Sequence, residues 1–399
     1  MKHSLSFLRH ASLSAMVLCG IALAAATASA QTQFSSGSTG ADGPLTFPAP
    51  GEYVIDMSAK PDGIWNYTTI NIPAGVKVSF TKNAANTAVV WLATGDVNIA
   101  GEVNLDGANG TLNVVRGNEA PGGPGGFRGG RGARRVDVSG NGIGTPGEGP
   151  GGGAPSTAGC VEGEGGVYST SGPGGLACSP IGGSGGGGSG SISGVDSANG
   201  GGGGGAILIA SSTAITIDGS LHANGGTGPL AGCSNGGGGS GGGIRLVANR
   251  IQGSGSITAL GGASFSWPSP GGPGRIKTEA FAFQLSNLTN PIATEDRPVP
   301  LCTNPGSIRI TSIAGQVVLS PGGNTASPDV IFSQAGPITV NLATTNIPQG
   351  TTLTVRVATD GQALTASTRT NASGNASATL TVPAGFGTIQ AYAEYMVTP

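Results

Sequence analysis

His222 is the residue best suited to acid–base chemistry in this 399-residue chain. The other two histidines, His3 and His10, lie in the first thirty residues. A Ser-His-Asp arrangement would require His222 to hydrogen-bond both a nucleophile and a carboxylate. Asp218 and Ser220 precede it with the same parity, so the residue types are present, but no nucleophile-elbow sequence accompanies them. We therefore predict an exposed histidine on the polar face of a strand, not a catalytic residue.

The sequence shows no closely paired carboxylates. Acid–base cleavage of a polysaccharide needs two carboxylates close together, and a calcium-dependent site needs several with a basic partner. Asp106 and Asp218 lie in comparable repeats but in different registers, and Glu162 and Glu164 lie in a glycine-rich segment. We therefore predict no catalytic residues, no cofactor and no metal site, with a carbohydrate-active enzyme as the alternative.

The one charge cluster is basic and consists of Arg128, Arg131, Arg134 and Arg135. Its sequence, FRGGRGARR, is similar to the RGG segments that bind nucleic acid. Charged residues make up only 10% of the chain and the two signs nearly balance, which argues against a nucleic-acid partner. Arginine also matches carboxylates and phosphates. Two hypotheses stay open: a solvated loop, which we favour, and a patch for an anionic envelope or extracellular polysaccharide.

Four cysteines, Cys160, Cys178, Cys233 and Cys302, follow the first thirty residues. No two have the spacing of a zinc site, and one histidine is too few to complete one. An even number in an exported chain predicts two disulfides, with three possible pairings. Cys160–Cys178 would close a loop of about 18 residues, and short loops close readily. This pair is favoured, and Cys178–Cys233 is the alternative if the glycine tracts beside them stack.

The first thirty residues predict export. Lys2 and Arg9 accompany an apolar stretch at 11–26 that is too short to span a bilayer, and Ala-Ser-Ala at 28–30 is typical of a cleavage site. No later stretch approaches the roughly 20 apolar residues of a membrane-spanning helix. We therefore predict cleavage near Ala30 and a secreted or outer-surface protein without a transmembrane span.

An internal repeat organises the middle of the chain. Residues 200–226 read GGGGGGAILIASSTAITIDGSLHANGG, and residues 237–262 read GGGSGGGIRLVANRIQGSGSITALGG. A more divergent copy covers residues 88–107. In each copy two glycines enclose a short strand: Gly101/Gly107, Gly219/Gly225 and Gly255/Gly261. A period in this range predicts stacked repeats.

Apolar and polar residues alternate within each copy of the repeat. Short strands with one buried face, punctuated by glycine, are typical of the coils of a parallel β-helix. A coil cannot bury its apolar face alone, so neighbouring coils must stack. We predict that residues 31–116 form a cap and the first coils, and that residues 206–289 form later ones. Long gaps between the strands disfavour a meandering antiparallel sheet.

Residues 117–205 form a glycine-rich insertion between these coils. The chain contains 77 glycines, and several tracts have a local period of three, such as Gly123, Gly126 and Gly129. One interpretation is a flexible linker, because ordering costs about 1–2 kcal/mol of backbone entropy per residue. The other is a set of polyproline-II-like tracts packed through their backbones, with glycine rows at the close approaches. This pattern resembles the glycine-rich bundles of some insect antifreeze proteins and phage adhesin tips.

The composition changes after a polar, proline-rich linker at 290–305. Residues 306–399 lose the glycine tracts and contain seven short alternating runs rich in Thr and Val, separated by turns. This pattern predicts an Ig-like β-sandwich, without the Cys…Trp…Cys spacing of immunoglobulin domains. The predicted fold is therefore all-β: a parallel β-helix with a glycine-rich insertion, followed by a sandwich.

Residues 200–280 resemble the glycine-rich, adhesin-like β-solenoid proteins that Gram-negative bacteria export. The motifs that carry the resemblance are GGGGGGAILIAS and GGGGSGGGIRLVAN. Most members have no assigned activity, so the resemblance implies location and architecture but no chemistry. We expect a structural or adhesive protein without catalytic activity. The alternatives are a pectin-lyase-like β-helix enzyme and an ice- or surface-binding module, although the coil strands lack the Thr-x-Thr ladders expected of the latter.

Overall fold

The computed structural model describes most of the chain after the predicted signal peptide, which lies outside the described residues. The described residues are 33–112, 114, 117–133, 142–157, 159–168, 176, 180–192, 197–232, 234–264, 269–286, 289–302, 306–318, 330, 335–384 and 387–393. Apart from one 3-10 turn, η1 (Met57–Ala59), the elements found in these residues are β-strands. The prediction of an all-β chain is confirmed.

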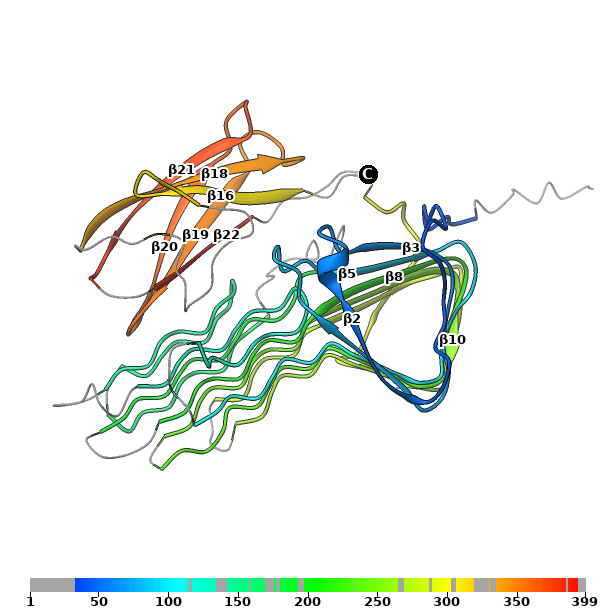
Figure 1. Ribbon diagram of the computed structural model, residues 1–399, viewed down its shortest axis with the longest axis horizontal. Helices are drawn as coiled ribbons and strands as arrows, with labels where there is room; N and C mark the ends of the chain where they lie inside the picture. Colours follow the sequence, from blue (N-terminus) through cyan, green and yellow to red (C-terminus); the bar gives the residue numbers. More distant parts are fainter. Residues whose placement is uncertain are drawn as a thin grey trace, which may run out of the picture. The chain divides into compact units, whose positions relative to one another are not determined.

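Two parallel sheets contain the first fifteen strands (Figure 1). The first sheet has nine strands: β1 (Gly43–Leu45), β3 (Ile64–Ile72), β5 (Val89–Ala93), β6 (Val97–Ile99), β8 (Ala206–Ile217), β10 (Gly243–Gly253), β12 (Arg275–Glu279), β13 (Ala282–Leu285) and β15 (Thr294–Asp296). The second has six: β2 (Gly51–Asp56), β4 (Val76–Thr81), β7 (Glu102–Asn104), β9 (Ser220–His222), β11 (Ser256–Thr258) and β14 (Thr289–Asn290). The first sheet therefore extends into the residues predicted as a linker.

Each copy of the sequence repeat supplies a strand to both sheets. The chain passes from β8 to β9 and from β10 to β11 through short glycine-containing corners. Leu221 pairs with Val103 on one side and with Ile257 on the other. This register superimposes the three glycine-bounded elements found in the sequence, so the repeat is the stacking unit of the second sheet.

The inner faces of the two parallel sheets share one hydrophobic core. Within β8 and β9, the residues of one parity are fully buried: Ile207, Ile209, Ile215, Ile217 and Leu221. Trp91 fills the neighbouring layer and packs against Tyr67 and Phe80 with ring-centroid distances of 6.3 and 5.7 Å. The predicted alternation is thus confirmed, because a period of two places apolar side chains on a single face.

The outer face of the first sheet is also covered where β8 and β10 pair. Leu208 and Val247 are buried there beneath Phe34 and Leu301. Burial on both faces explains why the AILIA sequence at the start of β8 is continuously apolar. On the same face, Nε of Arg245 lies 2.6 Å from Oε2 of Glu279, and both side chains are fully buried.

Glycine-rich tracts run side by side from the ends of these strands (Figure 1). We call them the glycine bundle; its tracts are 105–111, 119–133, 142–156, 161–167, 180–191, 197–205, 223–228, 235–242, 259–264 and 269–274. Residues 197–205 lead into β8, and residues 235–242 lead into β10. The bundle therefore contains tracts from the insertion and tracts that belong to the repeats.

The tract at 180–191 lies in the interior of the glycine bundle. Three consecutive residues, Gly186, Gly187 and Gly188, make six hydrogen bonds to five other tracts at N–O distances of 2.7–3.0 Å. Their N–H groups donate to the carbonyls of Gly201, Glu164 and Thr145, and their carbonyls accept from Gly130, Gly237 and Ser156. A chain that turns through 120° per residue presents its peptide groups to all sides in this way.

Side chains are excluded from the interior of the glycine bundle. A Cβ atom on Gly188 would fall on the carbonyl oxygen of Arg131, and one on Gly186 would fall on that of Gly237. Neither oxygen can yield as a flexible side chain would, because both belong to hydrogen-bonded backbone. Glycine is needed here for close approach, as at the axis of a collagen triple helix.

In the described residues after 306, seven antiparallel strands form two sheets. The first sheet contains β16 (Ser307–Ile313), β17 (Gln316–Val317), β18 (Gly336–Thr345) and β21 (Asn375–Val382); the second contains β19 (Thr352–Thr359), β20 (Gln362–Arg369) and β22 (Gly387–Ala393). Val340 and Leu342 of β18 share a hydrophobic core with Leu353 and Val355 of β19. We call this part the C-terminal sheets.

Candidate functional site

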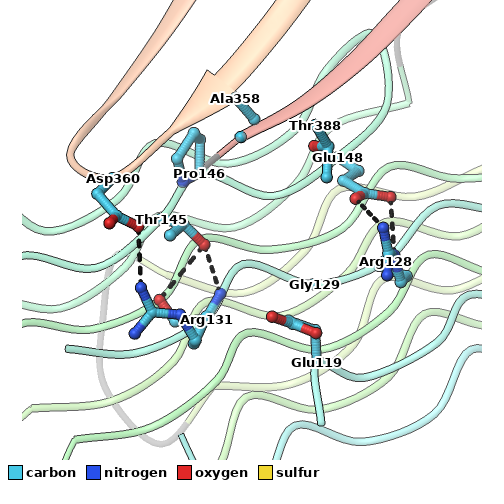
Figure 2. A pocket seen from close by; sticks show the side chains of 11 residues that line it. Glu119, Arg128, Gly129, Arg131, Thr145, Pro146, Glu148, Ala358, Asp360 and Thr388 are labelled. Atoms are coloured by element: carbon cyan, nitrogen blue, oxygen red, sulfur yellow. Dashed lines mark hydrogen bonds and ion pairs between the residues drawn. The ribbon is translucent and has the colours of Figure 1, made fainter. Parts of the chain in front are cut away.

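Arg128 and Arg131, two members of the predicted basic cluster, line a small pocket between the glycine bundle and the C-terminal sheets (Figure 2). Arg134 and Arg135 lie outside the described residues. Arg128 and Arg131 are three residues apart on the tract at 119–133, and both side chains line the same pocket. The wall opposite them includes Ala358.

Each of the two arginines faces a carboxylate of the chain itself. Arg128 makes a two-pronged contact with Glu148, at 2.7 Å from Nη2 to Oε1 and 3.2 Å from Nε to Oε2. Nη2 of Arg131 lies 2.8 Å from Oδ1 of Asp360, and the arginine side chain is only 5% exposed. Burial disfavours the charged form of Arg128, but the nearby Glu148 carboxylate favours it more strongly. The pKa of the guanidinium is therefore raised.

The charges that line the pocket therefore do not favour an added anion. A third carboxylate, Glu119, also lines it, so three acids accompany two arginines (Figure 2). The alternative hypothesis, a patch for an anionic polysaccharide, needs an excess of positive charge, which Arg128 and Arg131 do not supply in this arrangement. That prediction now depends on Arg134 and Arg135.

A third arginine, Arg356 of β19, reaches the glycine bundle and was not singled out in the sequence. Its Nη1 atom donates to the carbonyl of Gly147 at 2.7 Å, and its Nη2 atom donates to that of Gly152 at 3.4 Å. Burial lowers the pKa of this guanidinium. Gln390 of β22 accepts the N–H of Gly149 at 2.8 Å. Beside the pocket there is thus a junction at which side chains of the C-terminal sheets bind backbone groups of the tracts.

His222 lies on the outer face of the second parallel sheet, as its parity predicts, but it is 17% exposed and flanked by two carboxylates. Its Nε2 atom is 3.0 Å from Oε1 of Glu102, and its Nδ1 atom is 3.0 Å from Oδ2 of Asp106. Burial disfavours the charged ring, yet Asp106 and Glu102 together raise the pKa of His222. We did not predict the Glu102–His222–Asp106 group from the sequence. Aligning the glycine-bounded elements would have indicated it, because the alignment places Asn104 opposite His222 and so brings Glu102 and Asp106 close to the ring.

The other candidates from the sequence lie apart. Asp218 accepts hydrogen bonds from the backbone N–H and the hydroxyl of Ser254, at 3.0 and 3.2 Å, and so orders the corner that follows β10. Oε1 of Glu162 accepts a hydrogen bond from Asn235 at 3.1 Å. Among the described residues, no three His, Cys, Asp or Glu side chains converge in a way that could hold a metal ion.

The cysteines are only partly described. Cys160 and Cys302 are each disulfide-bonded, whereas Cys178 and Cys233 lie outside the described residues. The pairing therefore stays a prediction.

Comparison with known proteins gives no relative: no family model, no curated protein and no solved structure matches the chain. In the part of the chain that the structure describes, no helix is long and apolar enough to cross a membrane.

Proposed function

We propose that the chain is an exported structural or adhesive protein of the bacterial surface. In this proposal the parallel sheets are a β-helix, the tracts form a polyproline-II-like bundle, and the C-terminal sheets are an Ig-like sandwich. The observation that carries the proposal is that three arginines pair with carboxylates of the same chain. Arg128–Glu148, Arg131–Asp360 and Arg245–Glu279 all join segments of the chain to one another.

Fractionating the native host tests this proposal. We expect the chain, cleaved near Ala30, in the outer envelope or the medium. Recovery of the uncleaved chain from the cytoplasm would contradict it.

A carbohydrate-active enzyme is the second candidate, and the Glu102–His222–Asp106 group favours it. Two carboxylates beside a titratable ring, here on the outer face of a sheet, are residue types that cleave polysaccharides. The test is incubation with pectin, alginate and chitin. The structural proposal expects no turnover by the native chain. Cleavage that is lost in Asp106→Asn but kept in Asp218→Asn would establish the enzyme, because Asp218 shapes a corner away from the group.

Binding of an anionic polysaccharide would depend on Arg134 and Arg135, because Glu148 and Asp360 already pair with Arg128 and Arg131. Binding to alginate or lipopolysaccharide should fall in an Arg134→Ala, Arg135→Ala double variant. The matched control is Arg128→Ala, whose charge is already used by Glu148. Equal loss in both variants would contradict this assignment.

A further inference from the structure

His222 lies where two tracts of the glycine bundle leave the second parallel sheet. β9 ends at His222 and continues as the tract 223–228, and β7 lies beside it and continues as the tract 105–111. We call residues 105–107 and 222–224, at the starts of the two tracts, their roots, and backbone hydrogen bonds join them. The N–H of Leu105 donates to the carbonyl of His222, and that of Gly107 donates to the carbonyl of Asn224, both at 2.8 Å.

Both ring nitrogens of His222 face carboxylates, and one of these carboxylates holds the neighbouring root. Nε2 approaches Glu102 and Nδ1 approaches Asp106, each at 3.0 Å. Oδ1 of Asp106 also accepts the N–H of Asn224 at 2.6 Å. Nδ1 of His222 makes no aligned hydrogen bond to Asp106, so this contact is favourable only when the ring is protonated and charged.

A neutral imidazole cannot satisfy this arrangement. It has one N–H, so its second nitrogen would turn a lone pair toward a carboxylate oxygen. An imidazolium ring presents an N–H to each side and carries the charge that both acids require. We propose that protonated His222 is a pH-sensitive clamp that ties the roots of these two glycine tracts together, and that their attachment weakens as the ring loses its proton.

The groups around the ring include one cation, which competes with His222 for Glu102. On β4, Nζ of Lys77 lies 3.3 Å from Oε1 of Glu102 and partly neutralises that acid. On β11, the residue in register with His222 is Thr258, which carries no charge. Asp106 is the acid at the start of the adjoining tract. The clamp therefore depends on one histidine and two acids.

The direction of the pH effect follows from linkage. The acids raise the pKa of folded His222 above its ordinary value of 6.5. A group whose pKa is raised by folding contributes stability that is complete below the unfolded pKa and is lost as the pH rises through the folded pKa. The roots should therefore be held most firmly in mildly acidic solution.

The test combines two measurements on the full chain. NMR titration gives the pKa of His222, whose ring signal is assigned by its loss in His222→Asn. Hydrogen exchange gives the protection of the N–H groups of Leu105, Gly107 and Asn224 at pH values below and above that pKa. Each unit by which the pKa exceeds 6.5 should appear as a tenfold loss of protection at the higher pH, after correction for intrinsic exchange rates.

Two variants keep the test decisive. His222→Asn should retain the circular dichroism spectrum of the native chain and show protection at the roots that no longer depends on pH. Glu102→Gln should lower the pKa of His222 and shrink the pH dependence in proportion. A His222 pKa at or below 6.5 would overturn the proposal, as would protection in the native chain that does not change with pH.

Discussion

The parallel sheets and the glycine bundle solve the same packing problem in opposite ways. In the sheets, Ile207, Ile209 and Trp91 are fully buried, and apolar side chains fill the space between the layers. In the bundle, Gly186 and Gly188 are surrounded by backbone at distances that leave no room for a methyl group. One region is stabilised by burying side chains, and the other by omitting them so that peptide groups on all sides can hydrogen-bond. Adding and removing single carbons should therefore affect the two regions differently.

The largest effect should come from one added carbon inside the bundle. In Gly188→Ala the new methyl group meets the backbone of Arg131 and Gly132, which cannot move without breaking neighbouring hydrogen bonds. We expect a loss of about 3 kcal/mol or more in the free energy of unfolding, measured by chemical denaturation.

Gly272→Ala is the matched control in the same bundle. A methyl group there meets Val167 at ordinary contact distances of 3.5 Å and more, so the stability should change by less than about 0.5 kcal/mol. Equal losses in the two alanine variants would show that the close backbone approach at Gly188 is unimportant.

A smaller effect is expected where a side chain supports the bundle from outside. Arg356→Ala leaves the carbonyl of Gly147 without its 2.7 Å donor, which should cost about 1–3 kcal/mol. Arg309→Ala is the control, because Arg309 is an exposed arginine on β16, in the other of the two C-terminal sheets, and its loss should change the stability by less than about 0.5 kcal/mol. Thermal unfolding of both variants gives the comparison, and an unaffected Arg356→Ala protein would contradict the junction described above.

The smallest effect should come from one carbon removed in the sheets. Ile209→Val leaves a small void in a core of side chains that can partly relax, and should cost about 1 kcal/mol. The contrast with Gly188→Ala is the point of the experiment. If removing a methyl group from the sheets costs as much as adding one to the bundle, the two regions do not differ in how they are packed.

The sequence predicted the sheets better than the bundle, for a physical reason. The alternation of Ile215, Ile217 and Leu221 with polar residues indicates a buried face. The glycine-bounded elements that begin at Gly101, Gly219 and Gly255 indicate the register between β7, β9 and β11. In the glycine bundle, the side chains give no pattern from which the neighbouring tracts could be predicted. The five tracts around 186–188 are separated from one another in the sequence, and only the absence of side chains marks them.

The C-terminal sheets and the charged groups show the same limit. The strand β20 could not be predicted from alternation, because its inner positions include only the partly buried Leu364 and Ala366. The partners of Arg128 and Arg131 could not be predicted either, since Glu148 and Asp360 are brought near by tertiary packing. His222 was placed on the correct face from its parity, but its two acids follow only from the register between β7 and β9.

The central claim is that the glycine tracts form an ordered bundle held by backbone hydrogen bonds. Hydrogen exchange of the amides in residues 182–190, followed by mass spectrometry alongside those of β8, tests it most directly. The structure predicts that the N–H groups of these residues are protected by more than about 1000-fold over an unfolded chain, similar to those of β8. Exchange of residues 182–190 at unfolded rates, while β8 stays protected, would contradict the claim and leave the flexible linker as the correct description of this segment.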